Sequence, residues 1–237
     1  FDVQQVEVIR GPQGTLFGRN TTAGIIKFDS VKPRQDFDAY VKTTAGTLGQ
    51  FNLEGAVGGG LTDELSARIS LLSQNRSDWI DNAYLNESDA MGGYQERAGR
   101  VQFLYETADF NALLNLHSRN YAGTASIFRA NVFTKGSNDL NENYDRDTVY
   151  YDATVNNPQE YDSWGGSLKF DFMFDDMTLT SISSYETASG FSQSDVDGGT
   201  LEGPGFIPFP SSTRDELKDL EQYTQEVRLA SDTTDAF

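Results

Sequence analysis

The stretch VEVIRGPQGTLFGRNTTAGIIKF, residues 6–28, joins two short apolar runs through a glycine-rich loop. Residues 6–9 predict a short β-strand, and Arg10-Gly11-Pro12 ends it. A turn or a single helical turn is expected over residues 13–18, and residues 25–28 begin a second strand. Glycines at this density favour backbone with positive φ or the close approach of another chain.

This stretch resembles the carboxyl-terminal end of the plug domain of TonB-dependent outer-membrane receptors. In that family a run like Val6-Glu7-Val8-Ile9-Arg10-Gly11-Pro12-Gln13-Gly14 is followed by a Leu-Phe-Gly step, here Leu16-Phe17-Gly18. A small-residue turn and a hydrophobic strand then lead into the barrel, here residues 21–28. The match covers about a tenth of the chain, and it is specific because a long ordered string agrees.

The resemblance implies an all-β fold: a transmembrane antiparallel β-barrel, of which this chain would supply about eight of about 22 strands. The expected domains are residues 1–31 as the end of the plug, 32–35 as a linker, and 36–237 as the first part of the barrel. Because the chain starts inside the plug resemblance and shows no signal peptide, we expect it to be an internal piece of a longer protein.

The resemblance also implies a function: TonB-dependent active uptake of a scarce nutrient, most often a ferric siderophore, across the bacterial outer membrane. The implied partners are outer-membrane lipid, the TonB energy-transducing complex and a small ligand such as a metal chelate. The segment that contacts TonB precedes Phe1 in the family. No cofactor is expected, and the sequence does not identify the transported substrate.

The residues of the plug motif are expected to act in structure and gating. Glu7 and Arg10 match charged plug positions that commonly face charges on the barrel wall. Candidate wall partners lie on the polar rows of predicted strands; they are Arg68, Arg100, Glu106 and Glu226. The full motif set is Glu7, Arg10, Gly11, Pro12, Gly14, Gly18, Arg19, Asn20 and Gly24.

From about Asp36 onward, the sequence alternates between apolar and polar residues with a period of two. In residues 163–174, Trp164, Leu168, Phe170 and Phe172 share one face, whereas residues such as Lys169 and Asp171 share the other. A strand crosses the hydrocarbon layer with about 9–11 tilted residues, so this run is long enough. Similar runs around residues 68, 101, 114 and 226 bring the expected total to roughly eight strands.

From the second predicted barrel strand onward, short turns and long loops alternate along the sequence. Short turns are expected at residues 61–64, 107–109, 175–176 and near 231–234, with a further short connection at 47–49. Long loops are expected at about 75–93, 121–161 and 189–219. Short turns at one end and long loops at the other are typical of outer-membrane barrels. All six prolines fall outside the predicted strands, as their missing N–H requires.

Composition excludes several other classes of protein. The net charge is −18, from 18 basic and 36 acidic residues, which argues against a nucleic-acid partner. The chain has no Cys and one His, so thiolate and multi-histidine metal sites are excluded. No apolar run is long enough for a transmembrane helix. The mean hydropathy of −0.52 is compatible with a barrel, in which only alternate residues face lipid.

No motif in the sequence predicts catalysis, so we expect no enzyme and no catalytic residue. Residues 11–20 lack the spacing of a phosphate-binding loop. The alternating acids and amides of residues 139–147 resemble a calcium loop, but the turn glycine and the closing acid are missing, so no metal site is assigned. Two alternatives to the receptor stay open: a complete eight-stranded structural or adhesive barrel, and a soluble glycan-binding β-protein.

Overall fold

The computed structural model describes residues 1–17, 21–152, 155–174, 176–198, 209 and 211–231. Strands dominate, and they form three sheets with two, three and eight strands. The elements in chain order are β1 (Val3–Arg10), α1 (Gly14–Phe17), β2 (Gly24–Ser30), β3 (Asp38–Ala45), β4 (Phe51–Gly60), β5 (Leu65–Arg76), β6 (Ile80–Asn82), β7 (Glu87–Met91), β8 (Tyr94–Glu106), β9 (Phe110–Thr124), β10 (Thr148–Val149), β11 (Pro158–Phe174), β12 (Met177–Asp195) and β13 (Ser212–Ser231).

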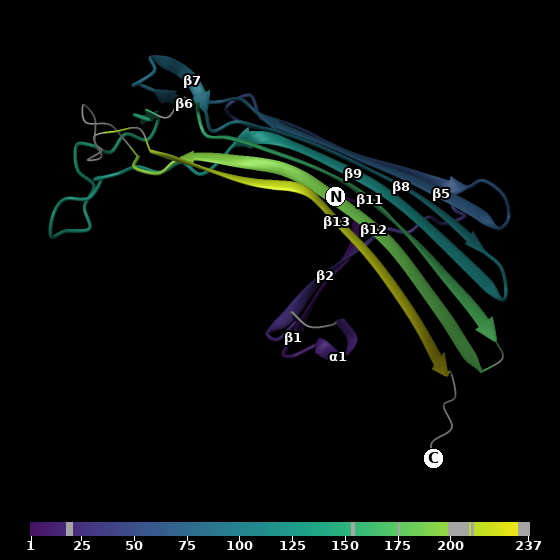
Figure 1. Ribbon diagram of the computed structural model, residues 1–237. Helices are drawn as coiled ribbons and strands as arrows, with labels where there is room; N and C mark the ends of the chain where they lie inside the picture. The colour runs from purple at the N-terminus through teal and green to yellow at the C-terminus, as the bar shows by residue number, and fades with distance from the viewer. Residues whose placement is uncertain (18–20, 153–154, 175, 199–208, 210, 232–237) are drawn as a thin grey trace.

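The large sheet has the strand order β13-β12-β11-β9-β8-β5-β4-β3, and each strand pairs antiparallel with its neighbours. Its long strands run side by side and bend together along their length (Figure 1). Among the described residues β3 and β13 do not pair with each other, so the sheet is an open part of a barrel wall. The predicted all-β fold with eight consecutive barrel strands is confirmed.

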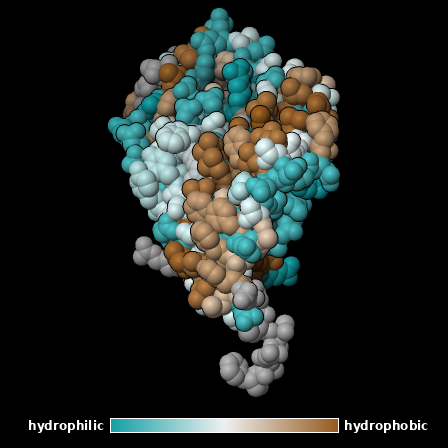
Figure 2. Space-filling view, turned by 90° about the vertical axis from the view of Figure 1, so that its right-hand side faces the viewer, coloured by the Kyte–Doolittle hydropathy of each residue, from teal (hydrophilic) through white to brown (hydrophobic). Residues whose placement is uncertain are grey.

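The two faces of the sheet differ in polarity, as the period of two predicts. Phe110 on β9 packs against Phe170 and Phe172 on β11, with ring centroids 5.8 and 4.9 Å apart. On the opposite face of β11, the Lys169 ammonium lies 2.9 Å from the Asp171 carboxylate. Figure 2 shows apolar side chains gathered in a band between polar regions. We call the face of Phe170 and Phe172 the outer face, and that of Lys169 and Asp171 the inner face.

From β4 onward the connections are sorted by length between the two ends of the sheet, whereas the short connection 46–50 lies at the same end as the long ones. Residues 61–64 and 107–109 make short turns at one end, whereas residues 77–93, 125–157 and 196–211 connect strands at the other. In Figure 1 the connections 77–93 and 125–152 lie at the end of the sheet where β6 and β7 are labelled. Of the predicted short turns, residue 175 and residues 232–234 lie outside the described residues.

The first long loop, predicted at about 75–93, lies at residues 77–93, whereas the predicted limits of the other two, 121–161 and 189–219, were wrong because the strands run further. β9 continues to Thr124 and β12 to Asp195, and β13 begins at Ser212. These extensions carry polar residues on both faces, so the alternation that marks a half-buried strand disappears there. Pro158, predicted to lie in a loop, is the first residue of β11, a position where a strand tolerates a missing N–H.

The long connections also contain structure that the sequence did not predict. β6 pairs with both β7 and β10 to form a small sheet. Ile80, Met91, Val149 and Tyr151 form its buried apolar cluster, and Trp79, Ala90 and Ile127 pack against it. The connections at this end of the sheet therefore have a core of their own.

The first thirty residues form a separate hairpin, in which β1 pairs antiparallel with β2 and Val6 lies opposite Phe28. Gly24 has φ = 141°, and a Cβ there would lie 2.5 Å from the Ile9 carbonyl oxygen, so the hairpin requires glycine at this position. Figure 1 shows β1, β2 and α1 on one side of the large sheet. Among the described residues, no helix reaches the length and apolarity needed to cross a bilayer.

Candidate functional site

The hairpin is attached to the large sheet through the second residue of the chain. Arg68, on the inner face of β5, donates from Nε to Asp2 Oδ2 at 2.8 Å and from Nη2 to Asp2 Oδ1 at 2.6 Å. The Ser70 hydroxyl also donates to Asp2 Oδ2, and the third Arg68 nitrogen, Nη1, donates to Asp38 Oδ2 at 2.8 Å. This two-pronged arrangement matches the planar guanidinium to the planar carboxylate and fixes the relative orientation of hairpin and sheet.

This contact, which we call the Asp2 anchor, is dry. The exposed fraction is 0% for the Asp2 side chain and 3% for that of Arg68. Burial by itself would raise the pKa of Asp2, but the hydrogen bonds from Arg68 and Ser70 outweigh it, and the pKa is lowered from 3.8. Asp2 therefore carries its charge at neutral pH, and it is neutralised by Arg68.

The backbone of Asp2 is held as well as its side chain. Its N–H donates to Glu54 Oε1 at 3.2 Å, and its carbonyl oxygen accepts from the Val31 N–H at 3.1 Å. The residue has φ = 49°, a left-handed conformation that is uncommon outside glycine but tolerated by Asp. Tyr40 donates to the same Glu54 oxygen at 2.7 Å. The anchor thus joins the start of β1, the end of β2 and three strands of the wall.

Arg100 lies beside the anchor on the inner face of β8. Its guanidinium carbon lies 4.9 Å from the centre of the Phe1 ring, a cation–π distance. Its Nη1 is buried and has no hydrogen-bond partner among the described residues. Arg68 and Arg100 therefore contact adjacent residues of the chain's first segment.

The structure separates the predicted site residues into distinct groups. Arg68 and Arg100 contact Asp2 and Phe1, whereas in the described residues no bond joins Glu106 or Glu226 to residues 1–30; Glu226 instead lies 3.9 Å from Arg228. Glu7 pairs with Lys27 inside the hairpin at 3.5 Å. The Arg10 carbonyl accepts from Gln13, and among the described residues no ion pair joins Glu7 or Arg10 to the wall.

The glycines and the proline of the motif shape the hairpin loop. Gly11 has φ = 86°, and its N–H donates to the Ala23 carbonyl at 3.1 Å. Pro12 lies between Gly11 and α1, and Gly14 begins α1. Gly18, Arg19 and Asn20 lie outside the described residues.

Sequence reasoning missed Phe1, Asp2 and Asp38 as partners of the wall. The available signal was Arg68 itself, because a basic residue on an enclosed polar row needs a carboxylate. Which of the 36 acidic residues supplies it could not be read from the sequence, since the contact joins positions far apart in the chain.

Polar side chains elsewhere on the inner face bond to one another across strands. His117 Nε2 lies 3.0 Å from Glu186 Oε2, and Arg119 Nε donates to Glu96 Oε1 at 2.7 Å. Thr180 donates to Asp171 at 2.7 Å. This face can remain hydrated and still be ordered, as the wall of a filled pore requires.

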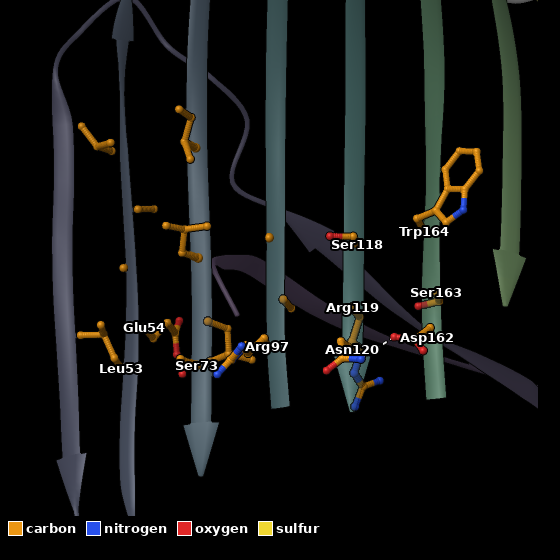
Figure 3. Close-up of a pocket in the computed structure, with 18 of the residues that line it drawn as sticks. Leu53, Glu54, Ser73, Arg97, Ser118, Arg119, Asn120, Asp162, Ser163 and Trp164 are labelled. Carbon is orange, nitrogen blue, oxygen red and sulfur yellow. Dashed lines mark hydrogen bonds between the residues drawn. The ribbon is translucent and has the colours of Figure 1, made fainter. Parts of the chain in front are cut away.

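A hollow of about 1090 Å³ lies on the other side of the wall, on the outer face (Figure 3). Its floor follows one register row, in which Gly55, Leu71, Gly99, Ser118 and Trp164 lie opposite one another on successive strands. Gly99 and Ser118 leave space between the large side chains of Leu71 and Trp164, and Gly55 leaves space beyond Leu71. Because this hollow faces away from the Asp2 anchor, it does not line the path past the hairpin.

Comparisons with known proteins agree with this architecture. No family model matches the chain. It is 35% identical over 106 residues to the pesticin receptor of Yersinia enterocolitica and of Yersinia pestis, a match that covers 43% of this chain and 15% of that receptor. The chain therefore spans a small part of the curated relatives it matches.

Among solved structures, the ferric yersiniabactin uptake receptor of Yersinia pestis is similar over 100% of this chain and 34% of its own, with a TM-score of 0.75 and 20% identity. The ferric-catecholate import receptor of Escherichia coli K12 gives a TM-score of 0.74 with 17% identity, over 98% of this chain and 36% of its own. These comparisons confirm the recognition made from residues 6–28: the chain has the fold of the TonB-dependent outer-membrane receptors over about a third of the length of such a receptor.

Proposed function

We propose that the chain is part of an outer-membrane receptor that takes up a ferric siderophore by TonB-dependent active transport. The observation that carries this proposal is the Asp2 anchor, which holds a plug-like hairpin against the polar face of a barrel wall whose other face is apolar. The curated relative is named a pesticin receptor, and the similar solved structures are named receptors for ferric siderophores. Transport requires no catalytic residue, and we propose none.

The proposed domains follow the elements. Residues 1–31 would be the end of the plug, since β2 ends at Ser30, and residues 32–35 would be the linker. Residues 36–237 would be the first part of the barrel, since β3 begins at Asp38. The ligand would bind the outer connections and the plug, and the energised TonB complex would then rearrange the plug to open a path along the inner face.

In this scheme the Asp2 anchor keeps the hairpin in place when no ligand is being moved. A buried, charge-assisted contact between two rigid elements is stable at rest and is broken as a unit when one element is displaced. The plug-motif residues Glu7, Arg10, Gly11, Pro12, Gly14, Gly18, Arg19, Asn20 and Gly24 would shape the moving piece. Arg68 and Arg100 would act as wall partners, and for Glu106 and Glu226 the same role stays a prediction.

The test is iron uptake by cells that produce the intact protein as their sole siderophore receptor. Ferric yersiniabactin and a ferric catecholate, each carrying radioactive iron, are the first two probes. We expect accumulation of label from at least one ferric siderophore, and its loss when a protonophore removes the energy source. Accumulation that persists without energy, or no accumulation from any ferric siderophore offered, would refute the proposal.

A further inference from the structure

Three carboxylates from two outer connections meet beside the small sheet. Asp152 lies between β10 and β11, Asp195 ends β12, and Asp197 follows it. One oxygen from each of the three side chains lies within 4.8 Å of the others. Segments distant in the sequence therefore bring their negative charges to one point.

Asp195 and Asp197 are buried and Asp152 is half-buried, and two of these side chains keep an oxygen without a donor in the described part of the chain. The exposed fraction is 2% for Asp195 and 7% for Asp197. Asp195 Oδ1 accepts from the Gly198 N–H at 2.8 Å, but its Oδ2 is buried without a hydrogen-bond partner among the described residues. Asp152 Oδ1 is buried in the same unbonded state. A buried carboxylate oxygen that no donor reaches costs free energy unless a cation compensates it.

Among the described residues, no side-chain cation compensates the charges of Asp152 and Asp195. In the part of the chain that the structure describes, none of the ion pairs of Lys, Arg or His involves Asp152 or Asp195. Burial raises the pKa of Asp195, and the negative charges of Asp197 and Asp152 contribute to the rise. Burial likewise raises the pKa of Asp152, and Asp197 adds to it.

The frame around the carboxylates is ordered. Asn157 is fully buried; its Oδ1 accepts from the Asp195 N–H at 2.8 Å, and its Nδ2 donates to the Ser126 carbonyl at 3.0 Å. Tyr151, next to Asp152, is fully buried in the apolar cluster of the small sheet, and its hydroxyl donates to the Phe128 carbonyl at 2.6 Å. The carboxylates thus come from fixed backbone on both sides.

We propose that Asp152, Asp195 and Asp197 bind a calcium ion that ties the connection between β9 and β11 to the end of β12. Calcium takes oxygen ligands at about 2.3–2.6 Å, so two oxygens on one ion lie no more than about 5 Å apart, which the cluster satisfies. Three carboxylates supply up to six oxygens, and their combined charge of −3 more than neutralises a hard divalent cation. Magnesium fits less well, because it retains several waters and demands octahedral geometry.

This site differs from the calcium-like pattern in the sequence. Asp139 and Asp145, which alternate with Asn141 and Asn143, are exposed and bond locally: Ser137 donates to Asp139, and the Asp147 N–H donates to Asp145 Oδ1. The exposed Asp145 is therefore a matched control, since it is an aspartate of the same outer connection as Asp152. The proposed site is independent of the transported substrate.

The experiment is calorimetric titration of the intact, detergent-extracted protein with calcium chloride, in parallel with its Asp195→Asn, Asp152→Asn and Asp145→Asn variants. Calcium sites of extracellular modules have dissociation constants of about 0.1–1 mM, which sets the range of the titration. We expect saturable binding to weaken at least about tenfold in each of the first two variants and to stay unchanged in the third. Calcium bound by co-purified lipid is common to all four samples.

Several results would overturn the assignment. One is equal calcium binding by all four proteins, and another is loss of binding in Asp145→Asn alone. Magnesium binding as tight as calcium binding would exclude the proposed ion. If Asp195→Asn fails to assemble, Asp152→Asn decides the matter, because it removes a ligand from the other segment without altering β12.

Discussion

Replacing Arg68 by glutamine is predicted to release the first residues of the chain from the wall. The change removes both hydrogen bonds to Asp2, at 2.8 and 2.6 Å, and the charge that neutralises a fully buried carboxylate. Breaking a buried ion pair by deleting one partner costs about 3–5 kcal/mol. Ser70 still donates to Asp2, so we take the lower end of that range, about 3 kcal/mol.

Amide hydrogen exchange in the intact protein measures this loss locally. The Val31 N–H donates to the Asp2 carbonyl and therefore reports the opening of the anchor. Each 1.4 kcal/mol is a factor of ten, so a loss of about 3 kcal/mol predicts exchange at Val31 roughly a hundredfold faster. Exchange in the middle strands of the large sheet is expected to stay unchanged.

Lys27→Gln is the matched control inside the same hairpin. It breaks the pair with Glu7, in which the exposed fractions are 42% and 43%, and the contact with Asp29. Exposed pairs contribute about 0–1 kcal/mol, so exchange at Val31 should rise by less than about fivefold. Equal effects of Arg68→Gln and Lys27→Gln would refute the reasoning, as would additive effects of Asp2→Asn and Arg68→Gln in a double-mutant cycle.

Three further predictions follow from the faces of the sheet, the hairpin and the pKa of Asp2. Leu114→Arg, on the outer face of β9, should lower the free energy of unfolding by about 2–4 kcal/mol, measured by urea unfolding from lipid vesicles. Asn115→Arg, at the next residue and on the inner face, should lower it much less. Equal losses would contradict the assignment of faces. Gly24→Ala should destabilise the hairpin by more than about 1 kcal/mol, whereas Gly14→Ala, in α1 with open space around it, should be neutral or stabilising, as exchange in β1 would report. The pKa of Asp2 lies below 3.8 in the folded protein, so its stabilising effect is complete above that value and is lost as the pH falls through the lowered pKa. The difference in thermal stability between the protein and Asp2→Asn should therefore stay constant from pH 7 to about pH 4 and shrink below pH 4. A difference that shrinks near neutral pH would contradict this prediction.

Alternation made the large sheet predictable from the sequence. The apolar side chain of Phe170 must avoid water, whereas the charged side chain of its neighbour Lys169 must contact water. A β-strand meets both needs because it places adjacent side chains on opposite faces. The need for glycine at position 24 was also predictable, since the glycine-rich loop between the two short strands favours backbone with positive φ. Both signals are local, and they survive without any knowledge of the rest of the fold.

Contacts between distant segments could not be predicted in this way. Asp2 and Arg68 are brought together by the path of the chain around the wall, and the residues next to each of them do not indicate which partner it has. The small sheet around Met91 and Tyr151 was missed because its strands have two to five residues, too few to show a period. The carboxylates of Asp152 and Asp195 also come from segments far apart in the sequence.

The central claim is that Phe170 and Phe172 face lipid while Lys169 and Asp171 face the plug. Because the chain has no cysteine, single cysteines can be placed at each position from 167 to 173 and spin-labelled in the protein reconstituted in vesicles. Labels at 168, 170 and 172 are expected to collide with oxygen dissolved in the bilayer, and labels at 167, 169, 171 and 173 to collide less with it. The reverse pattern, or accessibility without a period of two, would rule out these orientations of the side chains.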